Sequence, residues 1–109
     1  MERFVKGDVV VIPFPFSDLS GSKRRPALVI SNLEGYDFIL CQITSKNVKD
    51  KYAIELKDGD FKEGGLKQES NIRPNKIFTA DEDIILYKIG HLKNHKLQEI
   101  INKIIEIIR

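Results

Sequence analysis

Three consecutive cations stand directly before a short apolar run in the segment SGSKRRPALVIS. Arg25 is followed by Pro26 and the apolar residues 27–30, so its backbone is expected to be held rigidly while its side chain faces a polar loop. A guanidinium fixed in this way presents a planar fork of N–H donors that suits a phosphate group. Lys23 and Arg24 are expected to steer a nucleic-acid backbone instead. The alternative is that the charge run is only a solvated surface.

A second group of polar residues, QITSKN, comes at the end of an apolar segment. An antiparallel hairpin about Gly35 would bring Thr44 beside Arg25. Ser45 would add a hydroxyl group and Lys46 another positive charge. In the alternative interpretation, these hydroxyls merely satisfy a turn.

A third polar segment is ESNIRPNKIFTAD, residues 69–81, in which Arg73 follows two prospective donors, Ser70 and Asn71. Pro74 indicates that this extended segment lies at a sheet edge or contains a bulge. The segment is therefore either an edge strand protected by charges or one rim of a phosphate-binding groove.

The remaining reactive side chains give weaker signals. His91 and His95 have the i, i+4 spacing of some metal sites, but no further ligand pair accompanies them, so we expect surface residues and no metal. Cys41, the single cysteine, lies in an apolar segment and is expected to be buried and unreactive. The acidic residues 81–83 indicate a turn, and SGSKR lacks P-loop spacing, so no nucleotide cofactor is expected.

The elements that position these residues are predicted to be short strands followed by one helix. Apolar spacing of three and four from Leu97 to Ile108 predicts an amphipathic terminal helix with Asn94 as its N-cap. Residues 57–65, KDGDFKEGG, are predicted to form a polar turn region. Such a chain suggests a small, strongly curved sheet or a partly open barrel, with the helix covering one side. The predicted strands are residues 9–12, 27–30, 37–43, 52–56, 71–79 and 84–89.

The composition is that of an ordinary globular protein, with 41% hydrophobic and 31% charged residues. A length of 109 residues predicts one domain, residues 1–109. No segment resembles a membrane span or a secretory signal, and a single cysteine suits a reducing cytoplasm. The net charge of +2 permits a polyanionic partner but requires a local basic patch to bind one.

The motifs GDVV, RPALVIS and ITS, followed by SNIRPNKIFTAD and IGHL, resemble those of the MazF/PemK family of toxins over nearly the whole chain. The resemblance implies a mainly β (α+β) fold, a small SH3-like β-barrel of the MazF/CcdB type with a C-terminal helix, usually as a homodimer. It implies a cytoplasmic toxin of a type II toxin–antitoxin system that, without a metal or other cofactor, cleaves single-stranded RNA or mRNA at specific sequences. The 2′-hydroxyl attacks, leaving a 2′,3′-cyclic phosphate and a 5′-hydroxyl. A cognate antitoxin protein, and DNA binding in complex with it, are implied as well.

The resemblance also implies site residues. Arg25 of RPALV and Thr44 of ITS match the catalytic pair, and Arg25 is suited to stabilise negative charge that develops at phosphorus. Arg73 matches an arginine of the plasmid-borne branch, but Asn75 stands where that branch has an acid, and the first loop contains no histidine. The chromosomal branch, which relies on Arg and Thr, is therefore the better model. Residues expected to support RNA binding are Phe16, Ser17, Lys23, Arg24, Ser45, Lys46, Ser70, Asn71 and Arg73.

The first loop is expected to close over this site. Pro13 and Pro15 would stiffen its entrance, and residues 17–22 would form a flap. Either Phe14 or Phe16 would stack on an unpaired base while the other enters the core, because alternation places them on opposite faces.

Two other functions are compatible with the same architecture. One is a non-catalytic toxin similar to the CcdB-type inhibitors of DNA gyrase, although the terminal helix shows no obvious aromatic residue for protein recognition. The other is an RNA-binding module that does not cleave its ligand.

Overall fold

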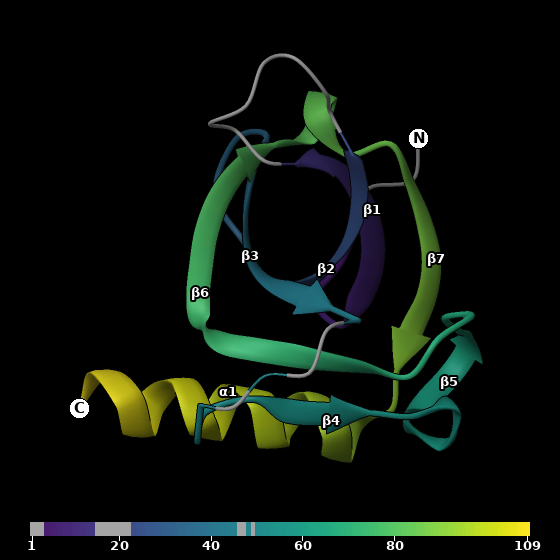
Figure 1. Cartoon of the computed structure of the whole chain (residues 1–109). Coiled ribbons are helices and arrows are strands. Elements are labelled where there is room, and N and C mark those ends of the chain that lie inside the picture. The colour runs from purple at the N-terminus through teal and green to yellow at the C-terminus, as the bar shows by residue number, and fades with distance from the viewer. Residues whose placement is uncertain (1–3, 15–22, 46–47, 49) are drawn as a thin grey trace.

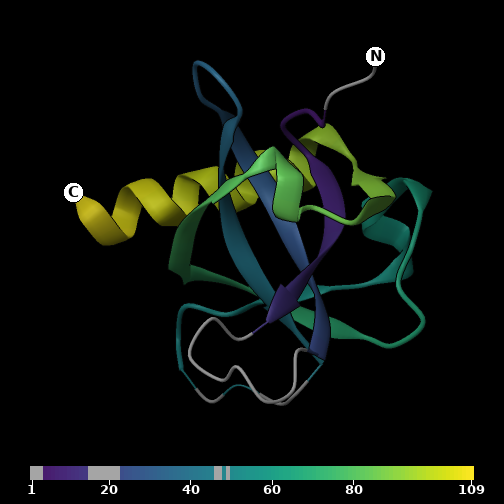
Figure 2. The ribbon, with the colours of Figure 1, turned by 90° about the horizontal axis from the view of Figure 1, so that it is seen from above.

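The computed structural model of the chain describes residues 4–14, 23–45, 48 and 50–109. Within these ranges, seven antiparallel strands form one sheet in the order β4-β6-β3-β2-β1-β7-β5. The sheet curls into a half-barrel, and α1 runs across one side of it (Figures 1 and 2). The mainly β fold and the curved sheet were therefore predicted correctly. The elements are β1 (Asp8–Phe14), β2 (Lys23–Asn32), β3 (Asp37–Thr44), β4 (Ile54–Leu56), β5 (Phe61–Gly64), β6 (Ser70–Asp81), β7 (Tyr87–Leu92) and α1 (Asn94–Ile108), with single turns of 3₁₀-helix at Asp58–Asp60 and Glu82–Ile84.

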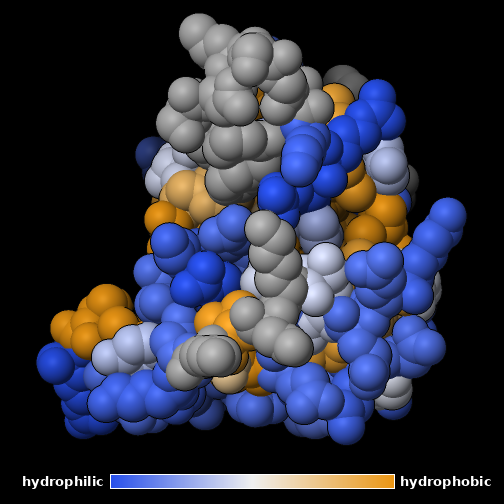
Figure 3. Space-filling model, in the orientation of Figure 1, coloured by the Kyte–Doolittle hydropathy of each residue, from blue (hydrophilic) through white to orange (hydrophobic). Residues whose placement is uncertain are grey.

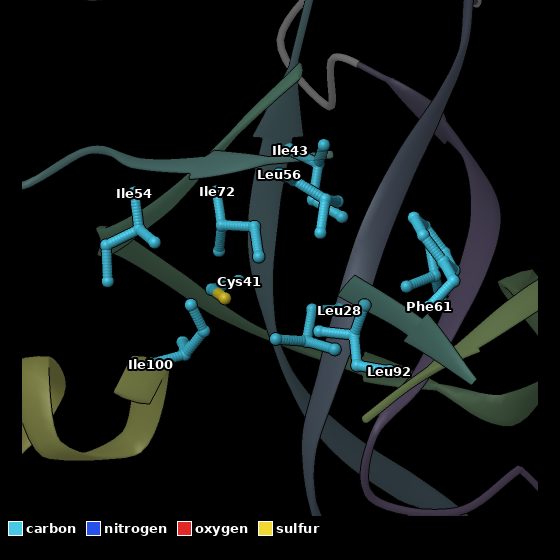
Figure 4. Packing of buried hydrophobic residues seen from close by; sticks show 10 residues of the cluster. Leu28, Cys41, Ile43, Ile54, Leu56, Phe61, Ile72, Leu92 and Ile100 are labelled. Carbon is cyan, nitrogen blue, oxygen red and sulfur yellow. The ribbon is translucent and has the colours of Figure 1, made fainter. Parts of the chain in front are cut away.

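The three strands β1, β2 and β3 are buried on both faces, which explains why they read as unbroken apolar runs. Successive side chains of a strand point to opposite faces. Val9 and Leu28 belong to a cluster that includes Ile100 of α1 (Figure 4). Val10 and Ala27 belong to a second cluster on the other face.

The helix is where its apolar stripe predicted it, with one change at its start. Ile100 is fully buried, whereas Ile108 at the far end is exposed. The predicted N-cap, Asn94, is wrong by one residue: Lys93 has the extended backbone of an N-cap, and its carbonyl accepts hydrogen bonds from the N–H groups of Lys96 and Leu97. Among the residues described, no helix combines the length and apolar character needed to cross a membrane.

The prediction of a polar turn over residues 57–65 was partly wrong. The structure has a strand, β5, at Phe61–Gly64, and it pairs with β7. Phe61 is buried in the main core cluster, so its packing outweighs the polar composition around it. Gly64 has a left-handed backbone, with φ of 71°. Gly90 lies against the Phe61 ring, leaving no room for a side chain.

The bounds of two other strands also differ from the prediction. The strand predicted at residues 52–56 begins only at Ile54, because the Asp50 carboxylate accepts hydrogen bonds from the N–H groups of Tyr52 and Ala53. The strand predicted at residues 84–89 is β7, which starts at Tyr87 after a 3₁₀ turn.

Strand β6 contains the predicted bulge. Gln42 of β3 pairs with Arg73, but the preceding residue, Cys41, pairs with Ile77, so three residues around Pro74 have no partner on β3. The alternative of an edge strand is wrong for the start of β6, which lies between β3 and β4.

Candidate functional site

A cavity of about 620 Å³ opens where β2 begins and β3 ends. Basic and hydroxyl groups from these two strands form one side of it, and the segment between β5 and β6 forms another. The remaining wall comes from β1 and β7. The lining residues are Val11, Lys23, Arg24, Arg25, Pro26, Ile43, Thr44, Ser45, Gly65, Leu66, Lys67, Gln68, Ser70, Tyr87 and Ile89.

The pairing of β2 with β3 brings Arg25 and Thr44 to this cavity. Ala27 pairs with Gln42, the last recorded pair of β2 and β3, and the same register extended by two residues would set Arg25 opposite Thr44. Directly opposed residues of an antiparallel pair lie on the same face of the sheet. Thr44 is buried with 6% of its surface exposed, and Arg25 is half-buried. A guanidinium-bearing and a hydroxyl-bearing residue thus line the same cavity.

Most of the other described candidates line the same cavity. Lys23 and Arg24 enter it from β2, Ser45 follows β3, and the buried Ser70 begins β6. Asn71 pairs with Thr44 across β3 and β6 and lies beside the cavity rather than among its lining residues. Phe16, Ser17 and Lys46 fall outside the described residues, as do Pro15 and the expected flap.

Arg73 is not brought to the cavity. Its Nη2 atom donates a hydrogen bond of 2.9 Å to Oδ2 of Asp50, in the segment before β4. This hydrogen bond is the main cause that lowers the pKa of Asp50 from its ordinary value of 3.8. The Nε atom of Arg73 is buried and, among the described side chains, has no hydrogen-bond partner. Because its Nη2 atom is committed to Asp50, Arg73 is placed to hold that segment against β6.

Among the polar and aromatic residues that line the cavity, sequence reasoning missed three, Lys67, Gln68 and Tyr87. Lys67 and Gln68 lie in the stretch GGLKQES, whose turn-forming residues give no periodic pattern that would predict a position beside the cavity. Tyr87 lies in the apolar run IILYKI, residues 84–89, which is predicted to be a strand as a whole. A polar aromatic residue inside an apolar run was the available signal. The same segment also borders a second hollow of about 390 Å³, because Leu66, Lys67 and Gln68 line both.

The two histidines and the cysteine lie outside the cavity. The prediction that His91 is a surface residue is wrong, because its side chain is half-buried and its Nδ1 atom lies 2.8 Å from Oδ1 of the buried Asp8. The other carboxylate oxygen of Asp8 accepts a hydrogen bond from the N–H of Val5. His95 is exposed. Burial raises the pKa of the Cys41 thiol to about 12, so the thiol is protonated and unreactive at neutral pH. In the part of the chain that the structure describes, no three His, Cys, Asp or Glu side chains gather as metal ligands would.

A half-barrel with a basic cavity at the ends of two central strands defines a class of small β proteins, and comparison with known proteins identifies the family. A family model of the PemK-like, MazF-like toxins of type II toxin–antitoxin systems matches residues 5–108. The chain therefore belongs to this family. No curated protein sequence matches it significantly.

Solved structures of the same fold are similar over nearly their full length. An endoribonuclease from a mycobacterial species has a TM-score of 0.74 and 15% sequence identity, covering 99% of this chain and 93% of that one. A chain of the crystal structure of MazE–MazF from Deinococcus radiodurans has a TM-score of 0.75 and 19% identity, covering 95% of this chain and 94% of that one. A mycobacterial endoribonuclease in complex with its cognate antitoxin has a TM-score of 0.73 and 15% identity, covering 97% and 95%. At these identities the likeness shows the fold.

Proposed function

We propose that this toxin is a metal-independent, sequence-specific endoribonuclease that cleaves single-stranded RNA, including mRNA. The observation that carries the proposal is the juxtaposition of Arg25 and Thr44 at one basic cavity. A cationic fork beside a hydroxyl suits a phosphodiester. Endoribonuclease activity in proteins of the same fold supports the proposal.

The reaction uses a nucleophile that the substrate brings. The 2′-hydroxyl attacks the adjacent phosphorus, the bond from phosphorus to O5′ breaks, and a 2′,3′-cyclic phosphate and a 5′-hydroxyl result. The proton of the 2′-hydroxyl leaves with a base, and the departing O5′ gains a proton. Arg25 stabilises the extra negative charge on the phosphoryl oxygens, while Thr44 orients the phosphate or the 2′-hydroxyl by a hydrogen bond. An arginine stays protonated at neutral pH, so Arg25 acts electrostatically rather than by moving a proton.

Partners follow from the same proposal. A cognate antitoxin would lay an acidic segment over the basic cavity, as charge complementarity favours, and the complex would bind DNA. The homodimer expected from the family has a candidate contact in the helix: apolar atoms gather at the C-terminal end of α1 (Figure 3), where Ile105 and Ile108 are 47% and 73% exposed. A reducing cytoplasm suits the free thiol of Cys41.

The test is cleavage of a long, mostly unstructured RNA in excess EDTA, with a DNA of the same sequence beside it and the new 5′ ends mapped. We expect cuts at one short sequence in RNA alone. Arg25→Ala should slow cleavage by a factor on the order of 10² to 10³, because a charge-stabilising donor is lost. Arg109→Ala, which removes an exposed arginine at the end of the helix, is the matched control and should cleave normally.

Intact RNA with folded wild-type protein would contradict the proposal, and so would equal rates for Arg25→Ala and the wild type. RNA that is bound but never cut would favour the binding module. Inhibition of DNA supercoiling by gyrase, without RNA cleavage, would favour a toxin similar to CcdB.

A further inference from the structure

We propose that Tyr87 is the platform on which an unpaired RNA base stacks within the cavity that Arg25 and Thr44 also line. The proposal rests on the proposed function, since it concerns how the same cavity holds single-stranded RNA.

The sheet places Tyr87 in line with the candidate catalytic strand. Tyr87 pairs with Val11 of β1, and Val11 pairs with Pro26 of β2, so the three residues lie opposite one another across three adjacent strands. All three line the cavity. Neighbouring strands are separated by about 4.8 Å, so the backbone of Tyr87 lies roughly 10 Å from that of Pro26. Side chains alternate along β2, so Arg25, the residue before Pro26, points to the other face of the sheet, and it shares the cavity with Tyr87 because both residues line it.

The Tyr87 side chain is available to a ligand. It is 46% exposed, whereas its cross-strand neighbour Val11 is only 7% exposed. Among the described residues that line the cavity, Tyr87 is the one aromatic residue. Its ring is therefore the single flat apolar surface that this wall offers.

The surroundings of Tyr87 are those of a single-strand binding groove. Lys23, Arg24 and Lys67 bring positive charge to the same cavity. Proteins that hold single-stranded RNA combine such charge along the backbone with aromatic rings on which bases stack. Every base has a π-face, so the ring contributes affinity and fixes the register of the strand but does not distinguish strongly between bases.

The first experiment measures binding of a single-stranded 2′-O-methyl RNA of mixed sequence, which lacks the attacking hydroxyl and stays intact. Loss of one base–aromatic stack predicts that Tyr87→Ala binds about 5- to 150-fold more weakly than the wild type. Tyr87→Phe keeps the ring and should bind nearly as well as the wild type. Tyr87→Leu, which is apolar without a π-face, should resemble Tyr87→Ala. Tyr36→Ala removes a tyrosine that is 67% exposed at the turn between β2 and β3 and should bind normally.

The second experiment observes the ring directly. The protein has three tyrosines and no tryptophan, so the double variant Tyr36→Phe/Tyr52→Phe leaves Tyr87 as its single tyrosine emitter. Stacking of a base should quench this emission as the RNA is added, with a midpoint that matches the binding curve.

Several results would overturn the proposal. They are unchanged affinity of Tyr87→Ala, equal affinity of Tyr87→Leu and Tyr87→Phe, or full Tyr87 emission when the RNA is saturating. A smaller molar mass of Tyr87→Ala by light scattering, with no quenching in the double variant, would instead place the ring between two subunits. None of these results bears on cleavage, which the Arg25→Ala comparison tests separately.

Discussion

The two arginines that the sequence singled out have different surroundings. Arg25 lies at the cavity beside Thr44, whereas Arg73 donates its hydrogen bond to Asp50. Their motifs, RPALV and SNIRPN, gave no means of telling these situations apart, because Asp50 is 23 residues from Arg73 in sequence. At this scale, the antiparallel pairing of β2 and β3 was predictable, and so was the position of Arg25 and Thr44 at the same ends of these strands. A contact between distant side chains was not.

Asp50→Asn should remove a contribution to the free energy of unfolding that is present at neutral pH and lost in acid. The Asp50 pKa is lowered in the folded protein, chiefly by the Arg73 hydrogen bond. Such a carboxyl stabilises the fold above its unfolded pKa, and the contribution is lost as the pH falls through the folded pKa. The wild type should therefore melt at a higher temperature than Asp50→Asn near neutral pH, and the difference should shrink below about pH 4.

Thermal unfolding followed by circular dichroism over a pH series measures this difference. Asp58→Asn, at an exposed carboxylate of the 3₁₀ turn before β5, is the control and should show a difference that varies little with pH. If the melting temperatures of the wild type and Asp50→Asn differ by the same amount down to pH 3, the ion pair between Asp50 and Arg73 does not stabilise the fold.

Elements with a strong apolar pattern were predictable, and those defined by tertiary contacts were not. Unbroken or periodic apolar residues predict four elements, β1, β2, β3 and α1. β5 contains a single apolar residue, Phe61, and exists because that ring packs in the core while the backbone pairs with β7. The cavity wall formed by Lys67 and Gln68 depends on the same pairing. For that reason sequence reasoning found the β2 and β3 side of the cavity and missed the opposite side.

Gly64→Ala should weaken the β5–β7 pair. Gly64 has φ of 71°, and a Cβ atom there would overlap the backbone carbonyl oxygen of Ile89, which cannot move without disturbing β7. We expect a loss of more than about 1 kcal/mol in the free energy of unfolding, measured by urea denaturation. Gly59→Ala is the matched control, because its Cβ would enter open space. Equal stability of the two variants would contradict the strained backbone at Gly64.

Ile100→Ala should destabilise the attachment of α1 to the sheet. Ile100 is fully buried in the main core cluster, so its truncation leaves a cavity and is expected to cost about 2–5 kcal/mol. Ile108 is 73% exposed in a single chain, so Ile108→Ala should change the free energy of unfolding of the monomer by less than about 0.5 kcal/mol, and by more if a homodimer covers this end of the helix. Urea denaturation of both variants checks the contrast, and a loss at Ile108 as large as that at Ile100 would show that the exposed end of the helix is buried in an assembly.

For the whole molecule, the distribution of charge matters more than its sum. The net charge is only +2, yet Lys23, Arg24, Arg25 and Lys67 all line one cavity. Composition alone therefore gave little indication of an RNA partner. The indication came from the curled sheet, which brings cations from two distant segments together.

The salt dependence of RNA affinity should report this concentration of charge. Each neutralised phosphate of a single strand contributes about 0.7 to the slope of log K against log salt. Replacing Lys23, Arg24 and Lys67 together with glutamine should therefore reduce that slope by about 2, in a titration with the 2′-O-methyl RNA.

A second triple variant with the same net charge is the control. Lys62, Lys93 and Lys103 do not line the cavity, and their replacement by glutamine should leave the slope close to that of the wild type. Equal reductions in both triple variants would show that RNA responds to total charge rather than to the cavity.

The sheet pairs the first strand of the chain with the last. Val11 and Tyr87, from β1 and β7, face each other across one ladder and share the cavity wall. A nascent chain folds from its N-terminal end as the ribosome extends it, so the cations of β2 emerge long before the residues that complete the wall. A message cut or terminated early would give a chain with the basic strand and no finished cavity. On the proposed function, only ribosomes that translate the message to its end would therefore produce an active enzyme.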